Sequence, residues 1–483
     1  MSNSGIQLEL VFEETANRFK DRLDNGSFFV LAEVNTPAKK SDLSAAVNRA
    51  SEIEYAVSGV RNIPACLAIT DKYLSPDSWN IGDFASQLCK SGRDNHLLYI
   101  SGKNASLDEL IETMEFCRSS GFKNFVPVSG DGVSGENMKQ TGKRTFTEGI
   151  HLLRRMKSQD DSTLFGGCAF NPFKYTPCDH FTQYFKLIKK INQGANFFVT
   201  QFGWDMLKLQ ELRWYLSSRG LYQPSIARLL LLTPEWVEQI SAGKCPGVHI
   251  SPDFQGILRK EVNYSYKQFE AAQWRRLQIQ AAGCKLLGYS GVQIAGLRNA
   301  EQVGIACNMI VEALNEFKTF ESWKNEYYEH LARAEMAPYP YRFYMFDKLF
   351  SEAHVDDFPS MKEGKIPQCS SSEKLHYRIC EFLFSHASRQ EADEHLITKK
   401  LFAGCRKCSF CRLPLTHYIC PELCPKGLSN GPCGGSQADG SCELGEMECI
   451  HSKRMRLASW LNEIDSLEEH YIKFAKKYSK AKK

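Results

Sequence analysis

The sequence predicts an α/β fold: a closed (β/α)8 TIM barrel followed by a helical connector and a small cysteine-rich metal-binding domain. Three observations lead to this prediction. From residue 28 to about 316, short apolar runs alternate with amphipathic helical stretches. The runs number eight, as closure of such a barrel requires. Eight of the 18 cysteines then gather between positions 405 and 449, far from the predicted barrel.

Length and composition agree with this division. The chain has 483 residues, of which 43% are hydrophobic and 24% charged, a globular composition too long for one ordinary core. We expect the barrel at 1–316, the connector at 317–400 and the cysteine-rich domain with a terminal helix at 401–483. The net charge is only +4, and the lysine-rich end carries no nucleic-acid-binding motif, so no nucleic-acid partner is expected.

Each predicted strand is apolar on both faces, as a buried parallel strand must be. An open doubly wound sheet is the alternative fold. Its first strand is normally followed by a glycine-rich phosphate turn, whereas residues 33–37 here read EVNTP. The predicted strands are 28–34, 65–70, 96–101, 125–129, 163–170, 196–202, 225–232 and 290–297.

Polar residues at the carboxyl ends of these strands are the first candidates for a functional site, because barrel enzymes place their chemistry there. Glu33 ends the first strand, Thr70 the second, Asp131 follows the fourth and Gln201 lies at the end of the sixth. A strand-end carboxylate is often only a helix cap. Glu33 has no helix start directly behind it, and burying a carboxylate without a purpose is costly.

Four segments on the expected strands resemble the methylenetetrahydrofolate reductase family over about residues 28–310. They are Glu33 with Pro37, Gly130 with Asp131, the segment GANFFVTQ at 194–201, and LRNAE at 297–301, close to the family's Leu-Asn-Arg-Ala-Glu. The resemblance implies a flavin (FAD or FMN) and reduction of 5,10-methylenetetrahydrofolate to 5-methyltetrahydrofolate in one-carbon metabolism.

The resemblance also implies roles for five residues. Glu33 would be the general acid that protonates the folate N10 and opens the five-membered ring. Asp131 would lie at the N1 and O2 edge of the flavin, next to the substrate, where a negative charge disfavours the anionic reduced flavin. Gln201 would hydrogen-bond the folate, Thr70 would line the flavin site, and Lys190 would meet the cofactor phosphate. Plain structural roles, such as a strand-end hydroxyl, a solvated lysine or a core amide, are the alternatives.

Two positions depart from the family pattern. Ser129 stands where the family commonly has an arginine, which removes one cation from the phosphate side and leaves FMN open. Ala295 stands where an aromatic residue of the folate site is expected near the eighth strand.

The connector and the terminal segment show helical patterns. Trp323, Tyr327, Tyr328 and Leu331 recur at helical spacing and predict packing against the barrel. The polar, serine-rich stretch 359–374 predicts a linker or surface loop. At the end of the chain, one continuous helix is expected to dock on the body of the protein through a single apolar face, formed by Leu457, Trp460, Leu461, Ile464, Leu467 and Tyr471.

The clustered cysteines predict metal. The first 30 residues show no secretory signal, and no segment is apolar enough to span a membrane, so we expect a cytoplasmic protein whose thiols stay reduced. Disulfides and isolated buried thiols are the alternatives. Eight thiolates suffice for two four-ligand sites. Cys405, Cys408 and Cys411 are expected to share one site, although spacing does not decide which later cysteine completes it. The others are Cys420, Cys424, Cys433, Cys442 and Cys449.

The segment CPKGLSNGPCGG at 424–435 resembles the C-terminal domain found with some reductases of this family. That resemblance implies iron-sulfur clusters, with zinc as the alternative. The leading hypothesis is a relay in which the clusters pass electrons to the flavin. The electron donor would be NAD(P)H, a ferredoxin-type protein or a partner redox subunit. The alternatives are a folate-linked methyl-transfer or demethylation enzyme that runs the step oxidatively, and a zinc-held docking platform.

Overall fold

Eight parallel strands form a closed barrel in the order β1 to β8, as the sequence predicts. The computed structural model describes residues 17–71, 77–132, 146–159, 163–338, 340–346, 362–385, 396–406, 408 and 411–480. Observed and predicted strand ends agree closely, but β6 stops before Gln201. The strands are β1 Phe29–Asn35, β2 Ala65–Thr70, β3 Leu97–Ser101, β4 Asn124–Val128, β5 Phe165–Phe170, β6 Phe197–Thr200, β7 Ser225–Leu230 and β8 Gly291–Ala295.

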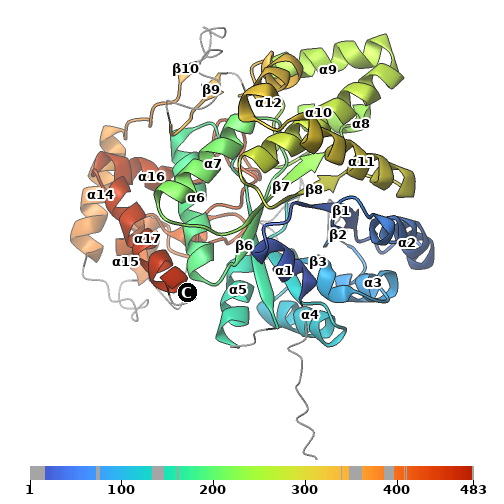
Figure 1. Ribbon diagram of the computed structural model, residues 1–483. Helices are drawn as coiled ribbons and strands as arrows, with labels where there is room; N and C mark the ends of the chain where they lie inside the picture. The colour runs from blue at the N-terminus through green and yellow to red at the C-terminus, as the bar shows by residue number, and fades with distance from the viewer. Residues whose placement is uncertain are drawn as a thin grey trace, which may run out of the picture.

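Helices surround the barrel and cover the outward faces of the strands (Figure 1). Many begin at a residue whose side chain caps the first turn, such as Asp42, Ser106 and Asp205. The helices of this layer are α1 Arg18–Asp24, α2 Leu43–Gly59, α3 Ile81–Leu88, α4 Leu107–Ser119, α5 Gly149–Ser158, α6 Pro177–Asn192, α7 Met206–Ser218, α8 Pro234–Ser241, α9 Pro252–Tyr264, α10 Tyr266–Leu286 and α11 Ala300–Glu316.

The amino-terminal end of the barrel is filled by aromatic side chains. Phe19 of α1 lies 5.7 Å from Phe29 and 5.3 Å from Phe197, measured between ring centroids, and Phe165 stacks on Phe197 at 5.2 Å. These rings form an aromatic plug inside the barrel at this end. Glu33, near the end of β1, lies toward the carboxyl-terminal mouth.

The connector packs against the barrel, as expected. Helix α12, Phe320–Tyr327, buries Trp323 completely, and the indole N–H donates to the Ile279 carbonyl at 2.7 Å. A π-helical turn, Tyr328–Ala332, follows and buries Leu331. No helix in the described part of the chain has the length and apolar character needed to cross a membrane.

The prediction of a loop at 359–374 is wrong for residues 371–374, which are helical. Residues 359–361 lie outside the described residues. Helix α14 spans Ser371–Phe384 and begins at Ser371 because Ser370 and Glu373 form a capping box, each side chain bonding the other's backbone N–H. A serine-rich stretch with a glutamate at this spacing is thus a helix start. Composition alone had suggested a loop.

The prediction of one continuous terminal helix is also wrong. The structure has α16, Ile450–Trp460, and α17, Ile464–Lys480, separated by a turn in which Asn462 adopts φ 58°. Asparagine tolerates this left-handed conformation and ends the first helix. Leu457, Trp460 and Leu461 pack with Tyr377 of the connector and with Cys420. The later apolar residues of the stripe pack on α6 and α7 instead.

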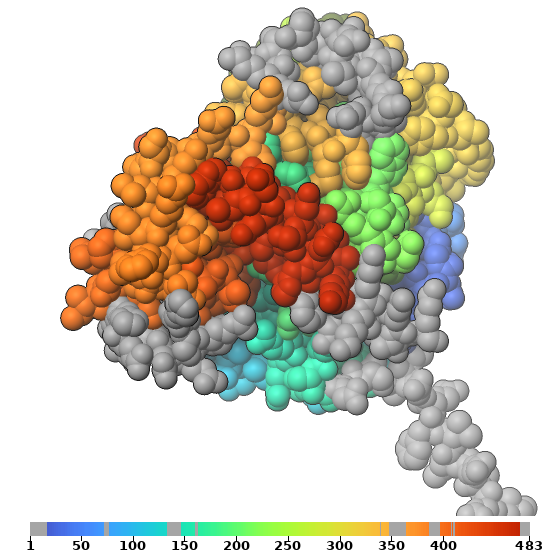
Figure 2. Space-filling model, turned by 90° about the vertical axis from the view of Figure 1, so that its left-hand side faces the viewer, coloured from blue at the N-terminus to red at the C-terminus, as the bar shows by residue number. Residues whose placement is uncertain are grey.

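The C-terminal helices lie against the barrel. In Figure 2 the red residues of α16 and α17 form a continuous surface with the orange residues of α14 and α15, Leu396–Ala403, and with the green part of the barrel. Tyr215 of α7 and Arg219, which follows α7 directly, both donate to Glu468 of α17, at 2.7 and 2.9 Å. The cysteine-rich domain is therefore fixed to one side of the barrel.

Replacing Gly283 with alanine tests the packing of the connector. A Cβ there would lie 2.3 Å from the Trp323 ring, and overpacking a core costs about 1–3 kcal/mol of unfolding free energy. The control is Gly304→Ala in α11, where a Cβ meets nothing within 4 Å and should add about 1 kcal/mol through helix propensity. Denaturant unfolding measures both, and equal stabilisation by the two alanines would contradict the packing.

Candidate functional site

Glu33 lies buried in the barrel mouth and is held by charge-assisted hydrogen bonds. Arg228 of β7 donates from Nε to Oε2 at 2.6 Å and from Nη2 to Oε1 at 2.5 Å. Gln293 of β8 donates to Oε2 at 2.7 Å, and its own amide oxygen accepts from the Tyr99 hydroxyl at 2.7 Å. Both carboxylate oxygens are thus occupied by side chains from β7 and β8.

Gln201 belongs to the same network. Its side-chain oxygen accepts from Nη1 of Arg228 at 2.9 Å and from the backbone N–H of Phe202 at 3.0 Å. The guanidinium carbon of Arg228 lies 4.8 Å from the centre of the Phe202 ring, an arginine-aromatic contact. Arg228 therefore joins two residues that the sequence had marked separately.

Asp131 lies at the same mouth, with its side chain accessible. Desolvation by the surrounding protein raises the pKa of its carboxyl. The positive charges of Lys426, Arg228 and Lys103 oppose this, and the negative charge of Glu443 adds to it. Glu33, Gln201 and Asp131 are thus brought together, and Arg228 acts on all three.

Two predicted site residues have other partners. Thr70 is buried and donates its hydroxyl to Oδ1 of Asn35 at 2.5 Å, a contact between adjacent strands. Lys190, near the end of α6, donates to the Ala169 carbonyl at 2.6 Å, and burial lowers its pKa to about 8. Neither joins the Arg228 network. Their cofactor-binding roles stay predictions.

The cysteine-rich domain reaches the barrel mouth through Lys426 and Glu443, which form a buried ion pair. The Lys426 ammonium donates to the Gly130 carbonyl at 3.0 Å, and the backbone N–H of Gly132 donates to Glu443 at 3.1 Å. These contacts hold the loop that carries Asp131 from both sides. The two domains therefore build this part of the mouth together.

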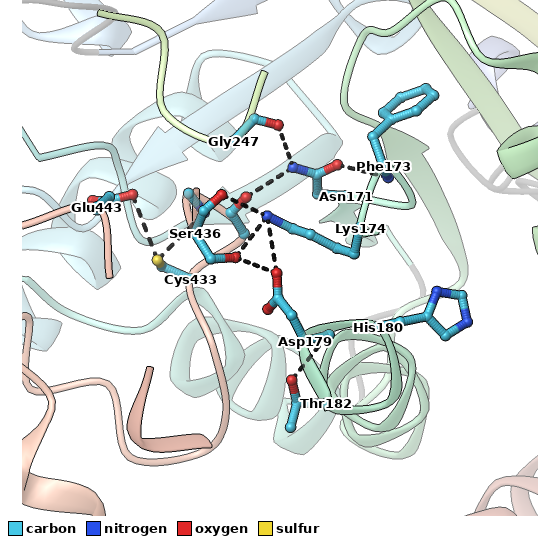
Figure 3. Close-up of polar contacts among 12 residues, drawn as sticks. Asn171, Phe173, Lys174, Asp179, His180, Thr182, Gly247, Cys433, Ser436 and Glu443 are labelled. Carbon is cyan, nitrogen blue, oxygen red and sulfur yellow. Dashed lines mark hydrogen bonds and ion pairs between the residues drawn. The ribbon is translucent and has the colours of Figure 1, made fainter. Parts of the chain in front are cut away.

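Residues 429–436 form a segment that we call the docking loop. Side chains of the barrel donate hydrogen bonds to its backbone carbonyls. Asn171 donates to the Gly434 carbonyl at 2.8 Å, and Lys174 donates to the carbonyl of Ser436 at 3.0 Å and to its hydroxyl at 2.7 Å (Figure 3). The Ser436 hydroxyl donates in turn to Asp179 at 2.6 Å. Gly434 has φ 99°, a conformation that favours glycine.

Helix α6 supplies further lysines to the docking loop. Lys186 donates to the carbonyls of Gly431 and Pro432, at 2.9 and 2.8 Å, and Lys189 to that of Asn430 at 3.0 Å. Glu148 accepts from the backbone N–H groups of Ser429 and Asn430. Although burial opposes it, the nearby Lys186 charge and these bonds lower the pKa of Glu148 to about 2.

The eight predicted ligands fall into two groups. One hollow of about 430 Å³, including its solvent-open part, is lined by four of them, Cys424, Cys433, Cys442 and Cys449, which we call the second cysteine group. The first cysteine group is Cys405, Cys408, Cys411 and Cys420. Burial raises the pKa of Cys420, and the charges of Cys405 and Cys408 raise it further. Cys411 and Cys420 share one small core. Cys420 is thus the candidate fourth ligand that spacing left open.

Backbone amides point at these sulfurs in a repeated way. Although burial raises the pKa of the Cys420, Cys424, Cys442 and Cys449 thiols, the backbone amides two residues after each act to lower it, and the amide of Gly435 donates to the sulfur of Cys433 at 3.4 Å. Amide donors of this kind neutralise thiolate charge and are typical of metal-thiolate centres. The donor set therefore fits thiolate-bound metal, whether iron-sulfur or zinc.

The coordinates do not bring these groups into a ready coordination sphere. Within the described residues, no three His, Cys, Asp or Glu side chains lie close enough to hold a metal ion. The described residues include all 18 cysteines, and every one is a free thiol. Metal binding by the two cysteine groups stays a prediction.

Several residues of the site were not identified from the sequence. Arg228 is a lone charge inside the apolar run of β7, the same signal that marked Glu33, and it could have been found in that way. Gln293 is likewise a polar residue inside β8. Lys426 and Glu443 gave no signal, because their role depends on where the cysteine-rich domain docks.

Single substitutions in each cysteine group test the grouping. Cys420→Ser should lose the metal of the first group only, and Cys449→Ser that of the second, because three thiolates retain metal poorly. Cys307→Ser, in α11 and outside both groups, should keep both. Elemental analysis of anaerobically prepared protein measures this, and less than one metal per wild-type chain with thiols oxidised in pairs would exclude both centres.

Comparisons with known proteins match both parts of the chain. The family model described as methylenetetrahydrofolate reductase matches residues 18–253, and the model described as methylene-tetrahydrofolate reductase C terminal matches residues 385–477. No curated protein matches the chain.

Two solved structures resemble the fold weakly. One, an uncharacterized protein from Clostridium thermocellum that binds two copies of 5-methyl-5,6,7,8-tetrahydrofolic acid, is 15% identical, covers 62% of this chain and 99% of its own, and has a TM-score of 0.45. The other, a putative dihydrodipicolinate synthetase from Pseudomonas aeruginosa, is 15% identical, covers 58% and 99%, and has a TM-score of 0.28. Neither likeness carries a functional argument.

The two family models cover the barrel and the cysteine-rich segment in the order expected from the sequence. The closed barrel is the fold that the resemblance implied. The chain therefore belongs to the methylenetetrahydrofolate reductase family of oxidoreductases, with a barrel joined to the C-terminal domain of such reductases.

Proposed function

We propose that the protein uses a flavin to reduce 5,10-methylenetetrahydrofolate to 5-methyltetrahydrofolate, and that a metal-bearing C-terminal domain delivers the electrons. In this proposal the barrel spans 1–316, the connector 317–400 and the metal domain 401–483. The observation that carries the proposal is the joining of Glu33 and Gln201 by Arg228 at the barrel mouth, where the charge of Arg228 also acts to lower the pKa of Asp131.

Glu33 is the residue proposed to move the proton. In the reductive direction a protonated Glu33 would protonate N10 and open the ring, leaving an electrophilic iminium on the folate. Its carboxylate oxygens accept from Arg228 and Gln293 in the structure, so one of these bonds must yield when the proton is on Glu33. In the oxidative direction, the carboxylate would take the proton from N10. The geometry is compatible with both directions, and the demethylating alternative remains open.

The mouth fits a flavin by its chemistry. Asp131 is accessible there, and the loop carrying it is fixed by backbone contacts at Gly130 and Gly132. A bound flavin, FAD or FMN, would supply the hydride that converts the methylene bridge to a methyl group. The carboxylate of Asp131 would orient the N1 and O2 edge, and Lys103, Lys426 and Arg228 would temper its negative charge. Gln201 would position the folate.

The relay is supported by the closeness of the second cysteine group to this mouth. Glu443, which accepts from Gly132 beside Asp131, also lies 3.5 Å from the sulfur of Cys433. A one-electron donor such as a ferredoxin-type protein cannot deliver hydride, so a nearby metal centre would let electrons reach the flavin singly. NAD(P)H would not need that centre. The zinc platform predicts the same docking but no electron transfer.

Replacing Glu33 with glutamine tests the proton-transfer role. Glutamine keeps the size and part of the hydrogen bonding but has no acidic proton, so folate reduction should fall on the order of 10²–10⁴ fold. Flavin content and flavin reduction should stay at wild-type levels, which separates chemistry from cofactor loss. Stopped-flow measurement of the two half-reactions checks this. Normal folate reduction by the variant would remove Glu33 from the mechanism.

The relay is tested in the full chain with Cys449→Ser. Truncating the domain would also strip Lys426 and Glu443 from the Asp131 loop, so a truncated barrel is not a clean comparison. The variant should keep folate oxidation with an artificial dye that exchanges electrons with the flavin directly, yet lose turnover with a reduced ferredoxin-type donor. Cys307→Ser is the control. Full turnover by Cys449→Ser with every donor would refute the relay.

A further inference from the structure

We propose that Arg228 is a positioning residue that fixes which atoms Glu33 and Gln201 present to the folate. The inference rests on the proposed function and names a residue that the family resemblance did not supply. It stands on one arrangement: a single guanidinium bonds Glu33 on one side and Gln201 on the other.

Arg228 holds Glu33 in one orientation. Two parallel N–H groups of the fork meet the two carboxylate oxygens, a pairing that fixes the plane of the carboxylate as well as its place. Gln293 adds a third donor on Oε2, and Tyr99 holds Gln293. When Glu33 gains a proton and loosens from the guanidinium, Gln293 remains to keep it at the mouth.

Arg228 also decides which end of the Gln201 amide is available. Both groups near the amide oxygen, the Arg228 Nη1–H and the Phe202 N–H, are donors, so the oxygen must face them. The NH₂ group is then the end left for a ligand. We infer that Gln201 acts as a hydrogen-bond donor and selects substrates that present an acceptor, such as a ring nitrogen or carbonyl of a pterin.

The Arg228 guanidinium is fixed by further contacts and is still partly exposed to solvent. It lies over the Phe202 ring, and the backbone N–H of Arg228 donates to the Thr200 hydroxyl at 3.1 Å. The Arg228 side chain is 12% exposed, against 2% for that of Glu33. A group that served stability alone could sit deeper in the barrel, whereas this one lies between the buried carboxylate and the mouth.

The test compares Arg228→Lys, Arg228→Gln and the double variant Arg228→Gln/Glu33→Gln with Glu33→Gln alone. Lysine keeps the charge but cannot bond Glu33 and Gln201 together. We expect kcat/KM for the folate to fall about 10²-fold in Arg228→Gln, the usual cost of a misplaced group, and to recover only in part in Arg228→Lys. Flavin reduction should not change.

The double variant distinguishes positioning from an independent role. If Arg228 acts on the chemical step through Glu33, the double variant at saturating folate should be no slower in the folate half-reaction than Glu33→Gln alone, because the misoriented Gln201 weakens folate binding and not the chemical step. Losses that multiply at saturating folate, or an Arg228→Gln variant with normal folate kinetics, would overturn the proposal. The control is Arg213→Gln, since Arg213 bonds Ser225 at the opposite end of β7 and should leave the kinetics unchanged.

Two further measurements keep the proposal testable. Removing Arg228 leaves the buried charge of Glu33 without its partner, so the unfolding midpoint of Arg228→Gln should fall. The double variant also removes that charge, so its midpoint should recover. If Arg228→Gln does not fold, the kinetics are judged from the double variant. Equilibrium dialysis with 5-methyltetrahydrofolate should show about tenfold weaker binding to Arg228→Gln, through the misoriented Gln201. If the wild-type protein binds 5-methyltetrahydrofolate but does not turn the folate over, the proposed function is refuted and the inference about Arg228 is not. If Arg228→Gln binds 5-methyltetrahydrofolate as tightly as the wild-type protein, the inference is refuted.

Discussion

The charge of Glu33 can be buried in the barrel mouth only because Arg228 lies opposite it. A carboxylate taken out of water without a partner would be very costly, and here three donors meet its two oxygens. The pair spans β7 and β1, which are not adjacent strands. β8 lies between them and pairs with both only when the barrel is closed. The aromatic plug lies at the other end of the barrel. Barrel closure and the polar site therefore depend on each other.

The cysteine-rich domain is bound to the barrel by a different principle. Its docking loop turns five backbone carbonyls toward lysine and asparagine side chains of the barrel, so that polar groups of the loop are satisfied although they are buried. The amides of Ser429 and Asn430 bond Glu148 of the barrel, while the amide of Gly435 donates to the sulfur of Cys433. One loop thus serves the interface with its carbonyls and its first two amides, and the proposed metal centre with the amide of Gly435.

This arrangement makes the domain more than an attached module. Lys426 and Glu443 hold the loop that carries Asp131, and Glu443 also approaches Cys433. A few contacts therefore connect the second cysteine group to the barrel mouth.

The sequence by itself determined the barrel, its eight strands and the strand-end residues Glu33, Asp131 and Gln201, because the alternation of apolar runs and the polar interruptions within them are local features. It also marked the cysteines. The terminal helix was misjudged because its apolar stripe continues across Asn462, although the two halves pack on different cores. Only the tertiary structure decided that Arg228 meets Glu33, 195 positions away, that Cys420 joins the first cysteine group, and that Lys426 reaches Gly130. Pairings over such separations arise from closure of the barrel and docking of the second domain, which no local pattern records.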